Sequence, residues 1–119
     1  MVEHQTLSHL PVMVCIANGS EEMETVNIID VLRRGDLEVI VAKVSNNASE
    51  KHDLKVEASR GVKLEADHHF DEVATRDFSV IVLPGGMEGA KAFAANHKLL
   101  ERLQKQRSSN RIVAAICAR

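Results

Sequence analysis

The stretch VMVCIANGSEEMETVNIIDVLRRGDLEVIVA, residues 12–42, decides the fold of this chain. It begins with the continuous apolar run Val12–Ala17, which is typical of a strand buried on both faces of a sheet. A second apolar run, Leu37–Ala42, predicts a second strand, and the segment between the two runs has the pattern of an amphipathic helix. A strand, a helix and a strand within about thirty residues indicate a βαβ unit with a right-handed crossover.

Capping residues are expected to set the ends of this helix. Ser20 is the predicted N-cap, because its hydroxyl can accept a hydrogen bond from a backbone N–H that would otherwise lack a partner. Glu21 and Glu22 then fall in the first turn, where the helix dipole favours negative charge. Two arginines followed by Gly35 indicate that the helix ends at Arg34.

The rest of the chain continues the alternation of strands and helices. The expected elements are a small antiparallel hairpin, a loop or short helix, a buried strand, a helix with a break near Asn96, and a final strand; in order they cover Leu54–Ala58 with Val62–Ala66, Asp67–Arg76, Phe78–Leu83, Met87–Gln106 and Ile112–Ile116. The fold class is therefore α/β, with an open, mostly parallel sheet. We expect one domain over residues 1–119, with a flexible tail over residues 1–10.

The chain stops at Arg119, directly after the last predicted strand. A doubly wound sheet needs helices on both of its faces, and no helix follows this strand. We therefore expect the chain to be an N-terminal fragment of its domain, incomplete at the C-terminus. The remainder of the same protein would then be lost or present as a separate chain.

Composition excludes several classes of function. The chain has 119 residues with 15 Lys and Arg against 17 Asp and Glu, a net charge of −2 without a basic block, so no nucleic-acid partner is expected. No apolar run has the length of a membrane span, and no membrane partner is expected. Two cysteines are too few for a disulfide framework, which favours a reducing compartment and a cytoplasmic location.

Cys117 is the first candidate catalytic residue. The final strand delivers it to a strand end, where the N-terminus of a following helix would lower the pKa of its thiol. A buried core cysteine is the alternative interpretation, and the residue's position leaves both open. Cys15, in the middle of a strand, is expected to be an inert core thiol.

Glu24 is the second candidate. It shares a helical stripe with Ile28 and Val31, which would turn its carboxylate toward the interior. Desolvation would then raise its pKa, so that it could exchange a proton with a neighbouring thiolate. The alternative is a surface glutamate that the helix dipole favours.

Gly85 and Gly86 form the third candidate, because two glycines after a strand permit a turn whose N–H groups bind an oxyanion. Many strand-to-helix turns use glycine, so this pattern alone is weak. The histidines lack a second ligand at zinc spacing, and neither a metal site nor a cofactor is expected. Asp30, Arg34 and Arg60 are expected to be exposed.

Three motifs in this order resemble the DJ-1/ThiJ/PfpI superfamily, and its DJ-1/YajL-like branch in particular. They are NGSEEMET at residues 18–25, LPGG at residues 83–86 and AAICA at residues 114–118. The resemblance runs from about Val12 to Ala118. It implies a flavodoxin-like sandwich and a homodimer.

The resemblance also implies roles for individual residues. Cys117 would be the reactive cysteine, and Glu24 the protonated glutamate that exchanges a proton with it. Gly85, Gly86 and Ala118 would supply the backbone groups of the oxyanion site. Residues that support the dimer and the active site would be Arg60, Asp30, Arg34 and Met23.

The function implied is that of a cysteine-dependent, cofactor-independent glyoxalase or protein deglycase acting on methylglyoxal-type 2-oxoaldehydes under oxidative or carbonyl stress. The alternative is a redox-sensing stress-response chaperone that works through oxidation of Cys117. A PfpI-type peptidase ranks third, because the base that it would need lies beyond Arg119.

Overall fold

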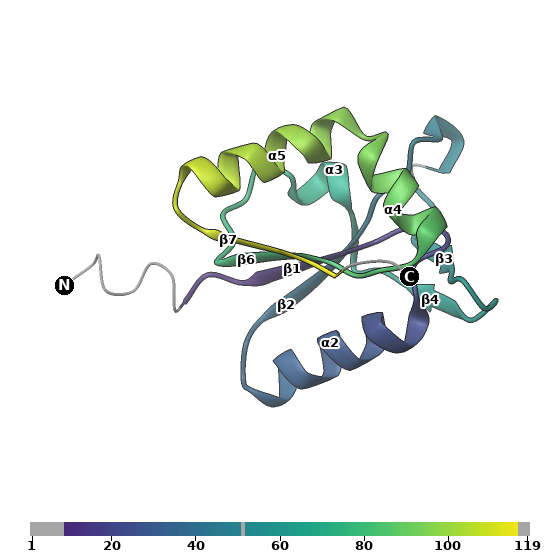
Figure 1. Cartoon of the computed structure of the whole chain (residues 1–119), viewed down its shortest axis with the longest axis horizontal. Helices are drawn as coiled ribbons and strands as arrows, with labels where there is room; N and C mark the ends of the chain where they lie inside the picture. Colours follow the sequence, from purple (N-terminus) through teal and green to yellow (C-terminus); the bar gives the residue numbers. More distant parts are fainter. Residues whose placement is uncertain (1–8, 51, 117–119) are drawn as a thin grey trace.

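Parallel pairing of apolar strands builds the main sheet of the computed structural model, which describes residues 9–50 and 52–116. Within those residues, the strand order is β5-β2-β1-β6-β7, and every pair is parallel (Figure 1). The strands are β1 (Val12–Ile16), β2 (Val39–Lys43), β5 (His68–His69), β6 (Val80–Leu83) and β7 (Ile112–Ala115). The expected α/β class with an open parallel sheet is therefore confirmed.

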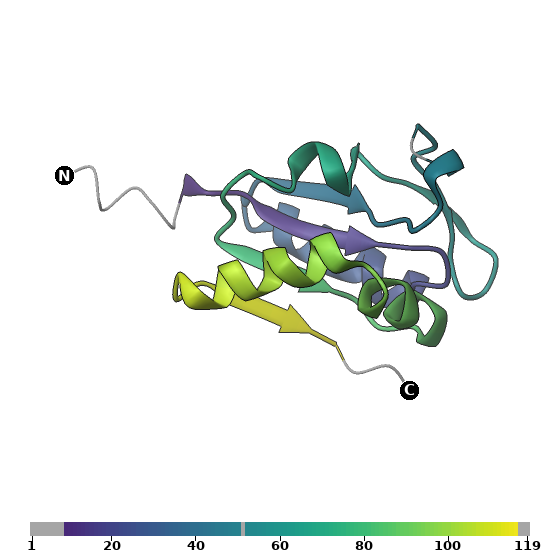
Figure 2. The same ribbon diagram turned by 90° about the horizontal axis from the view of Figure 1, so that it is seen from above.

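Helices cover the two faces of the sheet unequally. One face carries α2 (Glu22–Arg34), and the opposite face carries α3 (Phe70–Val73), α4 (Met87–Ala94) and α5 (His97–Ser108) (Figures 1 and 2). The expected end of α2 at Arg34 and the break near Asn96 are both confirmed. Asn96 caps α5 by accepting a hydrogen bond from Leu99 N at 2.9 Å.

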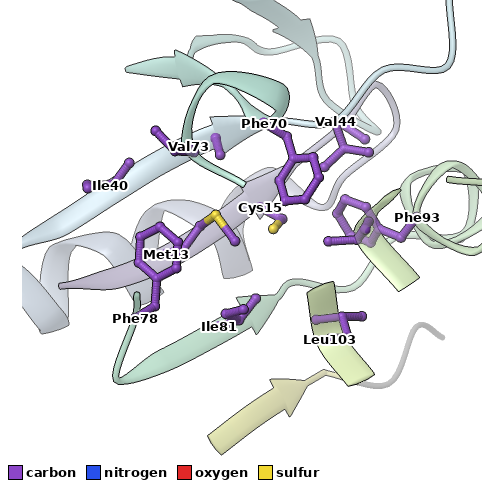
Figure 3. Close-up of a cluster of buried hydrophobic side chains, with 13 residues drawn as sticks. Met13, Cys15, Ile40, Val44, Phe70, Val73, Phe78, Ile81, Phe93 and Leu103 are labelled. Atoms are coloured by element: carbon purple, nitrogen blue, oxygen red, sulfur yellow. The ribbon is translucent and has the colours of Figure 1, made fainter. Parts of the chain in front are cut away.

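Alternate residues of β1 supply two separate cores. Val12, Val14 and Ile16 pack in a cluster with the α2 side chains, while Met13 and Cys15 belong to a cluster on the other face. Figure 3 shows this second cluster, to which the helices of that face and the loop before β6 also contribute. Because neighbouring strand residues point to opposite faces, a strand that is apolar at every position requires cover on both sides.

One local expectation was wrong and another was incomplete. The N-cap of α2 is Glu21 rather than Ser20: its Oε1 accepts from Glu24 N at 2.8 Å, whereas Ser20 Oγ accepts from Ala17 N at 3.0 Å. Ser20 instead closes the turn after β1. The segment expected to be a loop or short helix contains α3, but also the short strand β5, which no apolar run indicates because it consists of two histidines.

The antiparallel hairpin is present as β3 (Lys55–Glu57) and β4 (Lys63–Glu65), as expected. It follows a short 3-10 helix, η2 (Ala48–Glu50), and forms a sheet of its own beside the carboxyl ends of the main strands. The chain also leaves β7 partly open: α5 packs against it, yet 61% of Ile112 remains exposed.

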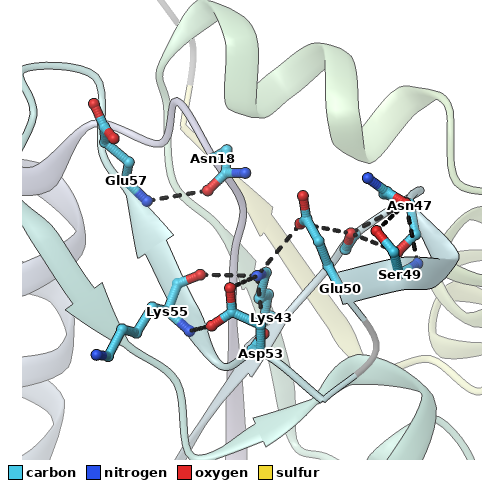
Figure 4. Close-up of polar contacts among 9 residues, drawn as sticks. Asn18, Lys43, Asn47, Ser49, Glu50, Asp53, Lys55 and Glu57 are labelled. Atoms are coloured by element: carbon cyan, nitrogen blue, oxygen red, sulfur yellow. Dashed lines mark hydrogen bonds and ion pairs between the residues drawn. The ribbon is translucent and has the colours of Figure 1, made fainter.

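Lys43 ties the hairpin to the main sheet. It is the last residue of β2 and only 1% exposed. Its Nζ donates to the carbonyl oxygens of Asp53 at 2.9 Å and Lys55 at 2.8 Å, and lies 3.4 Å from a carboxylate oxygen of Glu50 (Figure 4). A buried ammonium is stable only when its donors are satisfied, and these three residues satisfy them.

Replacing Lys43 with Met should lower the free energy of unfolding of the full-length gene product by about 2–3 kcal/mol, because two carbonyl oxygens and a carboxylate lose their donor. The matched control is Lys63→Met, an exposed lysine on β4, which should change the free energy by less than about 0.5 kcal/mol. Urea unfolding measures both. Equal losses in the two variants would contradict the role given to Lys43.

Candidate functional site

The connections that follow β1 and β6 leave the sheet in opposite directions. These strands are neighbours, yet β1 leads into α2 on one face and β6 into α4 on the other. In open parallel sheets such a switch point forms a crevice at the carboxyl ends of the strands, where ligands bind. The candidate site therefore lies between the loop at residues 17–21 and the turn at residues 84–86.

Glycines allow these two segments to touch. Gly86 has φ +112°, and a Cβ on it would overlap the carbonyl oxygen of Gly19. A Cβ on Gly89 would come within 2.9 Å of Ser20 N. Across the contact, Glu21 N donates to Gly85 O at 2.8 Å. The backbone itself thus forms the floor of the site.

Glu24 faces this floor. Its side chain is half-buried, and Oε1 accepts a hydrogen bond from Gly85 N at 2.9 Å. The expected stripe through Val31 was wrong, since 64% of Val31 is exposed; α2 packs instead through Thr25, Ile28, Ile29 and Leu32. Glu24 lies at the border of the buried face of α2: its side chain is half-buried, whereas its neighbour Thr25 is fully buried.

Strand β7 brings the chain to the same end of the sheet. Its neighbour Ile116 donates from its backbone N to Leu83 O at 2.9 Å, directly before the turn at residues 84–86. Cys117 and Ala118, the expected nucleophile and second oxyanion donor, lie outside the described residues. Their roles remain predictions.

A cavity of about 800 Å³ opens at this point. Its walls come from the β1–α2 loop, the start of α4 and the hairpin, and the lining residues are Asn18, Gly19, Glu21, Glu24, Glu57, Ala58, Ser59, Arg60, Gly86, Met87 and Glu88. Glu24 and Gly86, both predicted, thus share one cavity with Arg60. Gly85 does not line the cavity, but it supports the site through its hydrogen bonds to Glu21 and Glu24.

The hairpin wall is fixed by contacts that the sequence did not reveal. Asn18 Oδ1 accepts from Glu57 N at 3.0 Å across 39 positions of sequence, and Ser59 N donates to Ser20 O at 2.9 Å. No local pattern indicates pairs this far apart. These residues meet only because the folded chain places the hairpin beside the loop that follows β1.

Glu22 clamps the tip of the hairpin. Its carboxylate accepts from Ser59 Oγ at 2.7 Å, from Arg60 N at 2.8 Å and from Val62 N at 3.3 Å. Partial desolvation opposes ionisation, but these hydrogen bonds prevail and lower the pKa of Glu22 to about 2. The ionised Glu22 therefore helps to hold the backbone of Arg60 beside the cavity.

The other predicted support residues do not line this cavity. Asp30 and Arg34 form an exposed ion pair at 3.0 Å, one turn apart on α2. Met23 is 70% exposed on the same helix. Their expected contribution to a dimer concerns a second subunit, so it stays a prediction.

Cys15, the other cysteine of the chain, belongs to the hydrophobic core. Cys15 is fully buried, and desolvation raises the pKa of its thiol to about 12 against a smaller opposing effect of Arg102. This agrees with the expected inert core thiol.

Within residues 9–50 and 52–116, no group of three or more His, Cys, Asp or Glu side chains could hold a metal ion. None of the helices in those ranges is long and apolar enough to cross a membrane.

Comparisons with known proteins agree with this geometry. The model of the DJ-1/PfpI family matches residues 11–119. Protein DJ-1 homolog B of Arabidopsis thaliana is 50% identical over 90% of this chain, and glutathione-independent glyoxalase DJR-1.2 of Caenorhabditis elegans is 31% identical over 83%. The solved structure of oxidized Toxoplasma gondii DJ-1 is 37% identical and superposes with a TM-score of 0.82 over 91% of this chain.

The chain spans only part of each of these relatives. It covers 23% of the Arabidopsis protein, 49% of the Caenorhabditis protein and 55% of the Toxoplasma structure. These shares are consistent with the expectation that the sequence represents part of a longer domain.

Replacing Gly86 with Ala should destabilise the full-length gene product by about 3 kcal/mol, because the new Cβ combines an unfavourable φ with overlap against the β1–α2 loop. The control is Gly61→Ala at the hairpin tip, where φ is +88° but no atom lies within 4 Å of the added Cβ. That change should cost only about 1 kcal/mol. Thermal unfolding compares the two, and similar losses would show that the loop contact is not tight.

Protonation of Glu22 should release the hairpin in acid. Because the pKa of Glu22 in the folded chain, about 2, lies below its ordinary value of 4.5, the stabilisation is present above pH 4.5 and is lost as the pH falls toward 2. The difference in unfolding free energy between the wild type and Glu22→Gln should shrink over this range. A difference that stays constant from pH 7 to pH 2.5 would contradict the clamp.

Proposed function

The chain belongs to the DJ-1/PfpI family, and from this premise we propose that the protein is a cofactor-independent glyoxalase that converts methylglyoxal-type 2-oxoaldehydes into 2-hydroxy acids. The same site would serve a protein deglycase activity. One observation carries the proposal: the Glu24 carboxylate lies at a cavity in the switch point, 2.9 Å from Gly85 N. The name of the Caenorhabditis relative, a glutathione-independent glyoxalase, supports it.

Cys117 is the proposed nucleophile. The bond between Ile116 N and Leu83 O supports this assignment, because it holds the preceding residue at the strand end next to Gly85 and Gly86. A thiolate there attacks the aldehyde carbon, forming a C–S bond and an oxyanion that is protonated to a hemithioacetal. The N–H groups of Gly86 and Ala118 are the proposed donors to that oxyanion.

Glu24 is the proposed proton carrier. It removes the proton from the former aldehyde carbon, giving an enediol, and returns the proton to the neighbouring carbon. The result is a thioester of a 2-hydroxy acid on Cys117. Water then cleaves the C–S bond, releasing the hydroxy acid and regenerating the thiol, with no net gain or loss of electrons. The half-buried position of Glu24 supports this role, because its carboxylate meets both the Gly85 peptide and the cavity.

A second candidate function is redox sensing through oxidation of Cys117. The support is the Toxoplasma relative, which was solved in an oxidized form. The low exposure of Cys15 also supports it, because oxidation of this chain would then be confined to one of its two thiols.

We also propose a homodimer that uses the outer face of α2. Met23, Val26 and Val31 are exposed there at 70%, 47% and 64%, beside the Asp30–Arg34 ion pair. Apolar side chains on one helix face, flanked by charged groups, are typical of a protein interface.

The test of the glyoxalase proposal is methylglyoxal consumption with lactate detection by the full-length gene product. Cys117→Ser should abolish turnover, and Glu24→Gln should lower kcat by about 10²–10⁴-fold, because Gln can still accept from Gly85 N but cannot carry the proton. The control Glu101→Gln, an exposed residue of α5 away from the cavity, should leave kcat unchanged. Full turnover by Cys117→Ser would exclude the proposal, and no turnover by a wild type whose Cys117 still oxidises would favour the sensor.

A further inference from the structure

The loop after β1 contains an asparagine whose side chain is chemically vulnerable. Of the six asparagines in the chain, Asn18 alone is followed by glycine. A glycine has no Cβ, so its backbone nitrogen can approach the side-chain carbonyl carbon of the preceding asparagine with little hindrance. Asn18 is also exposed, and water therefore reaches it in the folded chain. Sequence and exposure together favour loss of its amide group.

The hairpin holds both reacting groups through one residue. Asn18 Oδ1 accepts from Glu57 N at 3.0 Å, a bond drawn in Figure 4, and Gly19 N donates to Glu57 O at 2.9 Å. The nitrogen that would attack and the carbonyl that would be attacked are thus both bonded to the backbone of β3. This is unusual protection for an exposed side chain, because it comes from fixed geometry rather than from burial.

The turn that carries the two residues is closed as well. Ser20 N donates to Ala17 O at 3.0 Å, and Ala17 N donates to Ser20 Oγ at 3.0 Å, so Asn18 and Gly19 are the central residues of a β-turn. Gly19 has φ +89°, the left-handed value that glycine supplies at the third position of a type II turn. Rotation of the Asn18 side chain onto Gly19 N therefore requires the loop to leave Glu57.

We propose that Asn18 is a modification site that stays intact while the hairpin is bonded to this loop and deamidates when the hairpin opens. In the reaction, Gly19 N attacks Asn18 Cγ, and a C–N bond closes a succinimide ring. The side-chain nitrogen takes up the Gly19 proton and leaves as ammonia. Water then opens the ring at Cγ to give aspartate, or at the main-chain carbonyl to give isoaspartate. No oxidant or reductant takes part.

The isoaspartate product does not fit the closed loop. Its main chain runs through the former side chain, which adds one backbone atom before Gly19. Gly19 has no room to shift, because even an added Cβ would overlap Glu88 Cβ and lie 2.9 Å from Gly89 N. An opening of the hairpin is thereby recorded as a lasting change in a loop that lines the cavity.

Glu22 controls how often the hairpin opens. Its carboxylate accepts from Ser59 Oγ, Arg60 N and Val62 N at the hairpin tip. A reaction that occurs only in the open form proceeds in proportion to the population of that form. Removing the Glu22 carboxylate should therefore speed deamidation at Asn18, although the two side chains do not react with each other.

The test is the rate of deamidation at Asn18 in the full-length gene product, followed by peptide mass and compared with a synthetic peptide of residues 16–25. We expect the wild type to react at least about a hundredfold more slowly than the peptide, because the open form is rare. Glu22→Ala should speed the reaction about tenfold, because three hydrogen bonds to the hairpin tip are lost.

Two controls separate hairpin opening from other causes. Glu65→Ala removes an exposed glutamate from the same hairpin, and Leu103→Val loosens the core beneath α5, so neither should change the rate. A wild type that deamidates as fast as the peptide overturns the inference, and so does an equal rate in Glu22→Ala and the wild type. Acceleration by Leu103→Val as large as that by Glu22→Ala also overturns it, because the reaction would then require unfolding of the core.

Discussion

Gly85 joins the two halves of the site, because both its N–H and its carbonyl bond to the start of α2. Its carbonyl accepts from Glu21 N and its N–H donates to Glu24 Oε1. Such closeness is possible only because Gly19, Gly86 and Gly89 leave no Cβ between the β1–α2 loop and the start of α4. The position of the Glu24 carboxylate at the edge of the cavity follows from this contact.

The hairpin adds a wall that the sheet alone would not provide. Lys43 holds its base through carbonyl oxygens, while Asn18 and Glu22 hold its strand and its tip. All three anchors are polar, which suits a segment with few apolar side chains. The cavity is therefore shaped on one side by backbone packing and on the other by hydrogen bonds.

Local patterns were sufficient for much of the fold and for part of the site. The apolar run Val12–Ala17 and the stop at Gly35 predicted the βαβ unit, because burial on both faces and helix termination have strong local signals. Ser20 was predicted as the cap, but its hydroxyl bonds to Ala17 N, and Glu21 caps the helix instead. Strand β5 lacked any apolar signal. Glu24 and Gly86 were predicted from the sequence as site residues and do line the cavity, whereas the contacts of Asn18, Glu22 and Lys43 depend on pairings that only the folded chain creates.

The buried thiol of Cys15 can report when the core of the protein opens. It lies on the central strand, paired with β2 on one side, and its side chain is fully enclosed in the cluster of Figure 3. Fraying of the hairpin does not uncover it, because no hairpin residue belongs to this cluster. A thiol probe therefore reaches Cys15 only when the helices of that face leave the sheet, so the labelling rate of this residue reports loss of the core in Figure 3.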